Sequence, residues 1–160
     1  MNYHLQNKPD REITSAEEIE SLLKKGKYIT IGLCRDNEPS VVTLSYGYDS
    51  ASNALYFHAS HVGMKMDFLK ANPNVCASII EDGGYIQDVC KHPFKTLIIR
   101  GKLTVVEDLE GKKHGMRVLL AHLEEKPSVQ QKLMLESEGV FSRMAVLKLE
   151  IDEVHGKAGQ

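Results

Sequence analysis

The stretch of the chain most suited to chemistry runs from residue 55 to residue 75, "LYFHASHVGMKMDFLKANPNV". Its first part has the composition of a strand, its middle has the spacing of a helix, and an Asn-Pro pair closes that helix. Polar and small residues gather where the strand meets the helix: His58, Ser60, His61, Gly63 and Lys65. Residues of these types at such a junction are suited to binding an anion.

Each of three residues at this junction adds something that a phosphate group would use. A helix N-terminus has free backbone N–H groups and the positive end of the helix dipole. Ser60 adds a hydroxyl donor, Gly63 lets a ligand approach the backbone closely, and Lys65 adds a positive charge. The pattern predicts a phosphate site. The alternative is a solvated lysine beside an ordinary capping serine.

The histidines have a less specific interpretation. A lone histidine at a strand end, such as His58, is more often a structural hydrogen bonder than a catalyst, and His61 is expected to be exposed. Cys90 and His92 supply only two candidate ligands, which are too few for a zinc site. No metal site is therefore predicted.

Periodicity and turn signals predict the elements that position the junction. Strands are expected at 28–34, 41–48, 54–59, 75–80, 94–108 (one long strand or a hairpin, with Gly101 as a bulge) and 143–154. Helices are expected after a capping box at Thr14 and Glu17, at 63–71, at 109–124 and at 128–137. Strands joined by tight turns must be antiparallel. The order of elements predicts a mainly β, α+β protein with about six antiparallel strands in a barrel-like sheet and helices outside it.

The composition is that of an ordinary soluble globular domain. The 160 residues are 42% apolar and 26% charged, with a formal net charge of -2, so the chain can bury a core and has no basic surplus for nucleic acid. No apolar run reaches the length of a membrane span, and neither a signal-peptide pattern nor a nucleotide-binding glycine motif is present. We expect one domain over 1–160, cytoplasmic, with reduced cysteines and with neither nucleic acid nor membrane as a partner.

Several stretches in order resemble one known family. The segment "LYFHAS..GMK...LKANPNVCASI" resembles the FMN-binding split barrels of the pyridoxamine 5'-phosphate oxidase-like superfamily, with the nitroimidazole-resistance (Nim-like) proteins as the nearest branch. The segments "YITIGLCRDNEPSVVTLSYGYD", "FKTLIIRGKLTVVED" and "EVHGK" resemble its first hairpins, its later strand pair and its C-terminal end. The resemblance implies a six-stranded antiparallel split β-barrel with flanking helices, and a homodimer with FMN at the subunit interface.

The resemblance also implies a cofactor site, residue by residue. The matching positions are Val42, Thr43, Leu44, His58, Ala59, Ser60, Met64 and Lys65. Lys65, eight positions before Pro73, matches the lysine that meets the FMN phosphate, and Ala59 and Ser60 match residues that line the phosphate and ribityl chain. The strand at 42–44 matches the one whose backbone edges the isoalloxazine ring.

Met64 and Thr43 are the two positions of this site that bear on which function the resemblance implies. Met64 stands where the oxidase usually has an arginine, and the substrate-binding residues of the oxidase are not recognisable near the C-terminus, so oxidation of pyridoxamine phosphate itself is not expected. Thr43 is a polar residue in "VVTL" that would donate to the flavin, or else lies on the solvent face of a strand. Catalytic residues are not assigned.

The resulting function is that of an FMN-dependent oxidoreductase that passes a hydride or electrons from a reduced nicotinamide to a small-molecule acceptor. The 81–93 loop and the partner chain are expected to form the substrate pocket, with Tyr85 as a candidate cover for the flavin. Three alternatives remain open: a flavin carrier or sensor without turnover, a barrel that holds haem or a deazaflavin with His58 or His61 as axial ligand, and a pure interaction domain.

Overall fold

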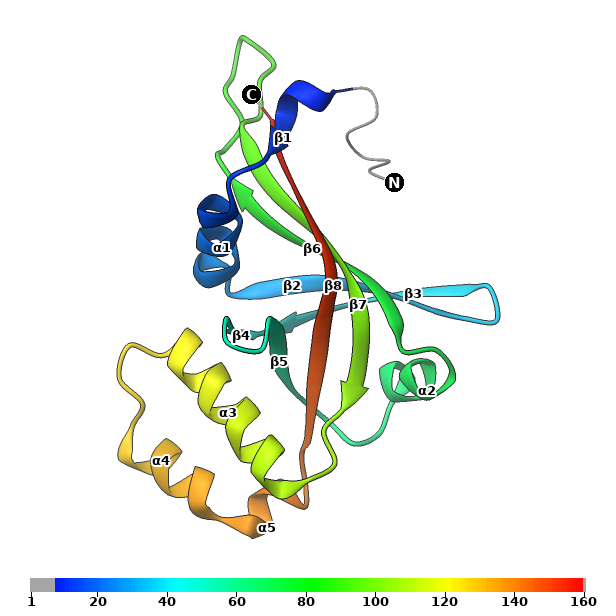
Figure 1. Ribbon diagram of the computed structural model, residues 1–160, viewed down its shortest axis with the longest axis vertical. Helices are drawn as coiled ribbons and strands as arrows, with labels where there is room; N and C mark the ends of the chain where they lie inside the picture. Colours follow the sequence, from blue (N-terminus) through cyan, green and yellow to red (C-terminus); the bar gives the residue numbers. More distant parts are fainter. Residues whose placement is uncertain (1–7, 160) are drawn as a thin grey trace.

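Segments such as "YITIGLC" alternate apolar and polar residues and therefore form strands with one buried face. In the computed structural model, which describes residues 8–159, eight strands make one antiparallel sheet with helices around it (Figure 1). The prediction of a mainly β, α+β fold with flanking helices is confirmed. Residues 1–7 and 160, the two ends of the predicted domain 1–160, lie outside the described residues.

The elements occur in the predicted order, but the strand predicted at 41–48 begins three residues earlier, the strand predicted at 143–154 ends five residues later, and the short helix at 138–141 was not predicted. The strands are β1 (Glu12–Ile13), β2 (Tyr28–Arg35), β3 (Glu38–Ser45), β4 (Gly47–Asp49), β5 (Ala54–Ala59), β6 (Asn74–Asp82), β7 (Phe94–Val105) and β8 (Ala145–Gly159). The helices are α1 (Ala16–Lys25), α2 (Met64–Ala71), α3 (Leu109–Leu123), α4 (Val129–Glu136) and α5 (Glu138–Phe141), with a 3₁₀ turn at Pro9–Arg11. The cap of α1 is Ser15 and not the predicted Thr14, because the Ser15 side chain accepts the N–H of Glu18.

The prediction of six strands is wrong by two short ones. β1 is only two residues long, and β4 begins inside the segment 41–48, which was predicted as one strand, and ends at Asp49. The strand is interrupted at Tyr46, which is fully buried and donates its hydroxyl hydrogen to the carbonyl of Leu23 at 2.8 Å. β3 pairs with β2 before this break, and β4 pairs with β5 after it.

At Tyr46 the chain passes from β3, at one end of the sheet, to β4, at the other end. Hydrogen-bonded neighbours follow the order β3-β2-β6-β7-β8-β5-β4, and β1 pairs with the end of β8. Among the described residues β3 and β5 are not paired, although their Cα atoms come within 8 Å of each other. The sheet therefore bends round without closing, as in a split barrel.

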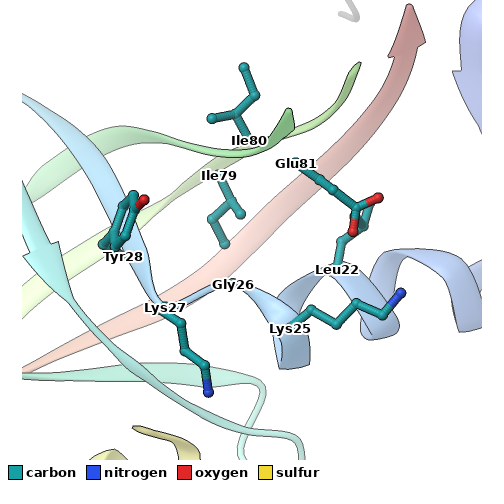
Figure 2. A pocket seen from close by; sticks show the side chains of 8 residues that line it. All are labelled: Leu22, Lys25, Gly26, Lys27, Tyr28, Ile79, Ile80 and Glu81. Atoms are coloured by element: carbon teal, nitrogen blue, oxygen red, sulfur yellow. The ribbon is translucent and has the colours of Figure 1, made fainter. Parts of the chain in front are cut away.

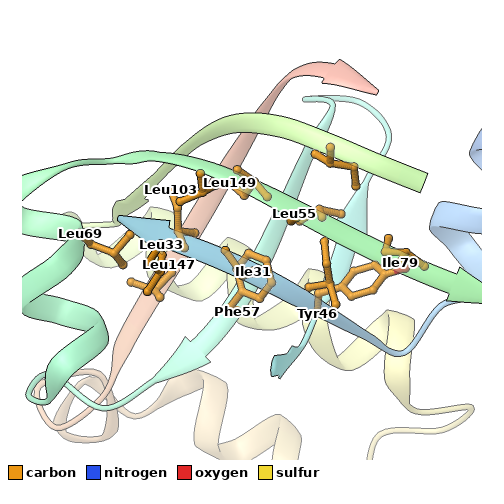
Figure 3. Close-up of a cluster of buried hydrophobic side chains, with 14 of the residues drawn as sticks. Ile31, Leu33, Tyr46, Leu55, Phe57, Leu69, Ile79, Leu103, Leu147 and Leu149 are labelled. Carbon is orange, nitrogen blue, oxygen red and sulfur yellow. The ribbon is translucent and has the colours of Figure 1, made fainter. Parts of the chain in front are cut away.

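The inward faces of the strands form the main core. It contains fully buried side chains from β2, β5, β7 and β8: Ile29, Ile31, Leu55, Phe57, Leu97, Ile99, Leu147 and Leu149. Figure 3 shows part of this cluster, with Ile31, Leu55, Phe57, Leu147 and Leu149 among the labelled residues. A second cluster lies between the sheet and α3–α5 and includes Tyr56, Met116, Phe141 and Val146. The barrel and the helical insertion thus share β5 and the first part of β8, residues 145–149, where side chains on both faces are buried.

Two glycines let α3 lie close against the barrel. A Cβ on Gly47 of β4 would lie 2.5 Å from the Cα of Leu119, and a Cβ on Gly115 of α3 would lie 2.6 Å from the Tyr56 ring. Any larger residue at either position would push α3 away from the sheet. The position of α3 is therefore fixed by backbone-level contacts with β4 and β5.

Candidate functional site

The first wall of the candidate site is the free edge of β3. Within the described part of the chain β3 pairs only with β2, so its second edge presents backbone N–H and C=O groups without strand partners. Val42 and Leu44 are half-buried against the core, whereas Thr43 is exposed and shares a 3.1 Å hydrogen bond with the hydroxyl of Thr30. The edge can hydrogen-bond a planar ring, while Thr43 itself faces outward.

The second wall is the end of β5. β4 pairs with β5 only as far as Tyr56, so residues 57–59 have β8 on one side and no strand partner described on the other. His58 lies opposite Val146 of β8 and is exposed, while Ala59 is buried in the main core. The predicted site residues on β3 and β5 therefore border the same split in the sheet.

The predicted strand-to-helix junction is present at the end of this wall. Gly63 caps α2 with a φ of 119°, a conformation that favours glycine. Its carbonyl accepts the N–H groups of Met66 and Asp67 at 2.9 and 3.3 Å. The amides of Met64 and Lys65, the first two of the helix, have no protein acceptor among the described residues. The junction thus has the free donors that an anion needs.

The side chains at the junction also keep donors available. The Ser60 oxygen accepts the N–H of Val62 at 3.4 Å, which leaves its own hydroxyl hydrogen free to donate. Lys65 is half-buried and has no hydrogen bond or ion pair with any described residue. Met64, at the position of the missing arginine, is 61% exposed. The fit to a phosphate group is good, with Lys65 as the side-chain cation.

The exposed histidines at the junction differ from the others in the described chain. His58 and His61 are exposed and have no hydrogen-bond partner described, whereas His114 and His92 pair with carboxylates. Within residues 8–159 no group of three or more His, Cys, Asp or Glu side chains is arranged to hold a metal ion. No helix in this range is long and apolar enough to cross a membrane.

The 83–93 loop lies far from the junction of its own chain. β6 begins beside α2 and ends at the loop, and its nine residues span about 27 Å. Figure 1 shows the loop at the opposite end of the sheet from α2. Here Asp82 and His92 form a 2.7 Å pair, and the Tyr85 ring stands edge-on to His92. Tyr85 therefore lies away from the junction of its own chain (Figure 1), and its role as a cover for the flavin stays a prediction.

One surface was missed from the sequence. Outward-facing positions on the adjoining parts of β2, β3 and β6 carry no charge: Tyr28, Thr30, Gly32, Val41, Thr43, Ser45, Cys76, Ser78 and Ile80. Among them Tyr28, Val41 and Ile80 are exposed by 66, 67 and 64%. The sequence does show that every second position lacks charge in these parts of the three strands. It does not show that the three strands are neighbours, which the strand order β3-β2-β6 establishes.

A cavity of about 220 Å³ adjoins this uncharged outer face (Figure 2). Tyr28, Ile79 and Ile80 line it from the sheet, and Leu22 and Gly26 line it from the end of α1. It contains none of the residues predicted to hold the cofactor. The cavity and the outer face share Tyr28 and Ile80, so anything that covers the face also covers the cavity.

Comparison with known proteins identifies the family to which these features belong. Residues 15–158 match the family model described as pyridoxamine 5'-phosphate oxidase. The fold is similar to a proposed 5-nitroimidazole antibiotic resistance protein from Bacteroides thetaiotaomicron, with a TM-score of 0.79, 24% identity and coverage of 92% of this chain and 86% of that one.

Two further solved structures share the fold. One is an FAD-binding protein from Mesorhizobium loti, with a TM-score of 0.67, 23% identity and coverage of 94% and 98%. The other is an FAD and haem binding protein from Mycobacterium smegmatis, with a TM-score of 0.75, 19% identity and coverage of 94% and 74%. At these identities the likeness establishes the fold.

Proposed function

Because the chain belongs to the pyridoxamine 5'-phosphate oxidase family, we propose that it binds FMN along the split between β3 and β5. The observation that carries this proposal is the set of free donors at the start of α2. Lys65, the Ser60 hydroxyl and the first amides of α2 have no acceptors among residues 8–159, and all of them are suited to a phosphate. The unpaired edge of β3 supplies donors and acceptors for the ring. Solved proteins with this fold that are described as FAD-binding support a flavin ligand.

Bound FMN would supply the redox chemistry, and we propose that the protein is an oxidoreductase acting between a reduced nicotinamide and a small acceptor. The residues of this chain would anchor the phosphate and orient the ring. Met64 gives the phosphate one cation fewer than the oxidase pattern has, so Lys65 carries the side-chain charge of the site alone. A nitro compound or a quinone-like acceptor fits the Nim-like resemblance.

The uncharged outer face supports a homodimer that completes this site. Charged residues are depleted at the cores of protein interfaces, and three strands of this face have none in their middle. Thr43 lies on that face, one residue from the two that back the ring edge. Burying the face would therefore bring a partner subunit beside the flavin, and would supply walls that the 83–93 loop of the same chain does not.

The test is the visible absorption spectrum of the purified protein, before and after addition of FMN, FAD or haem followed by removal of the excess. A flavin spectrum retained with FMN, together with a mass of twice 17.9 kDa in solution, supports the proposal. A protein that retains no flavin contradicts it, and a Soret band would move attention to His58 and His61. Consumption of NADH or NADPH with a nitro or quinone acceptor separates an oxidoreductase from a flavin carrier.

A further inference from the structure

The helical insertion α3–α5 is held against the barrel by two histidines on one face of α3. His114 lies in the middle of the helix and His122 in its last turn. The Nε2 atom of His114 pairs with the carboxylate of Asp49 at 2.9 Å, and the ring of His122 contacts the backbone of Tyr48. Both contacts therefore reach β4, but one is with a charged group and the other with neutral groups.

The contacts of His122 determine its protonation state. Its Nε2 atom lies 2.5 Å from the carbonyl oxygen of Gly26, which can only accept, so Nε2 carries a hydrogen. Its Nδ1 atom lies 3.4 Å from the backbone nitrogen of Tyr48, which can only donate, so Nδ1 carries none. His122 is thus neutral and bridges the α1–β2 connection to β4. The Lys27 ammonium donates to the backbone carbonyl of His122 at 2.7 Å and so caps the C-terminal end of α3.

A second proton on the His122 ring would have no hydrogen-bond acceptor among its two described partners. On Nδ1 it would meet the N–H of Tyr48 and break that hydrogen bond. The ring is half-buried and stacks at a tilt on Tyr46, with the centroids 4.9 Å apart. Burial lowers the pKa of His122 most, the hydrogen bond to Gly26 raises it, and the charge of Lys27 lowers it, with a net lowering from 6.5. The other titratable groups that face this site are Lys24 of α1, Tyr48 and Asp49 of β4.

His114 makes a different kind of contact, with a charged group. Its partner Asp49 is held as a carboxylate, since hydrogen bonds from His114, Ser52 and the backbone together outweigh burial and lower the Asp49 pKa. The ring of His114 also stands edge-on to Tyr56, and Lys148 of β8 is within electrostatic reach of Asp49. The contact in the middle of α3 therefore rests on a carboxylate acceptor, whereas the one at its end rests on a neutral ring.

We propose that His122 is an acid-sensitive latch, whose protonation releases the last turn of α3 from the α1–β2 connection while the His114–Asp49 pair keeps the rest of the helix docked. Above pH 6.5 the neutral ring holds the latch closed. As the pH falls below 6.5, the unlatched state takes up a proton that the latched state does not. The equilibrium constant for opening then rises by up to about tenfold per pH unit, until His122 is protonated in the latched state as well.

Hydrogen exchange of the full chain, followed by mass spectrometry between pH 7.5 and 5.0, tests this proposal. Rates are divided by the intrinsic rates at each pH, so that only the opening equilibrium remains. The protection of the last turn of α3 should fall as the pH drops below 6.5, by at most about 30-fold at pH 5.0, while peptides around His114 keep theirs. Equal protection of the last turn at both ends of the pH range overturns the proposal.

Two variants and one direct titration sharpen the result. His122→Gln keeps an N–H donor for Gly26 but cannot be protonated, so its protection should not depend on pH, whereas His114→Gln should keep the pH dependence at the last turn. The same pH dependence in His122→Gln overturns the proposal. Nitrogen-15 NMR of the unmodified protein needs no variant to fold: it should show the Nε2–H tautomer of His122 with a midpoint below 6.5, and a midpoint at or above 6.5 overturns it.

Discussion

Replacement of Lys65 by alanine isolates the charge that is expected to hold the FMN phosphate. Lys65 has no partner in the described protein, so its removal breaks no existing contact. A charge-assisted hydrogen bond contributes about 1.5–3 kcal/mol, which corresponds to a rise in the Kd for FMN of about 10- to 150-fold. The amides of α2 and the Ser60 hydroxyl remain, so binding should weaken and not vanish.

The fold should tolerate this change. A lysine in the first turn opposes the helix dipole, and alanine is the best helix former. The free energy of unfolding of the protein without flavin should therefore stay the same or rise by about 0.3–1 kcal/mol. Lys70→Ala is the matched control, because Lys70 is exposed in the last turn of the same helix and favours the dipole. It should leave the Kd for FMN unchanged and lower the stability slightly.

The assay is a titration of protein freed of flavin with FMN and, in parallel, with riboflavin, which lacks the phosphate. Lys65→Ala should weaken FMN binding and leave riboflavin binding within about twofold, and it should reduce the dependence of FMN binding on salt. Equal losses for the two ligands would refute the assignment of Lys65 to the phosphate. An unchanged affinity for FMN would place the phosphate elsewhere.

Three further substitutions, two of them with a control variant, test the fold and the interface. Tyr46→Phe removes the buried hydrogen bond to the carbonyl of α1 and should lower the free energy of unfolding by about 1–2 kcal/mol in urea denaturation. Gly101→Ala would place a Cβ against a backbone carbonyl of β8 and should lower the free energy of unfolding by about 3 kcal/mol or more. Its control is Gly139→Ala in α5, where a Cβ meets open space, so this change should be neutral or stabilising. Thermal melts of the two variants measure the difference. Val41→Asp puts a charge on the uncharged outer face and should convert the proposed dimer to monomers in sedimentation velocity. Lys102→Asp on β7, outside that face, is the control and should leave the dimer intact. A dimer that survives Val41→Asp would refute this interface.

The sequence alone determined the local structure of the site. Glycine at 63, the apolar spacing after it and Asn-Pro at 72–73 are short-range signals, and α2 begins and ends within a residue of its predicted bounds. The capping box at Ser128 is present as predicted, and the register shift in β7 falls at Gly101. These features were readable because each depends on the conformational preferences of a few neighbouring residues.

Tertiary structure decided what lies beside what. β8 pairs with β5 and β7, which precede it by about 90 and 50 residues, and no local pattern specifies such partners. That order opens the split between β3 and β5, and it places the 83–93 loop away from α2. Tyr46 divides the predicted strand at 41–48 into β3 and β4, because its ring is fully buried and its hydroxyl donates to a carbonyl of α1. His122 gave no sequence signal either, since its neutral state follows from one acceptor and one donor that folding brings to its two ring nitrogens.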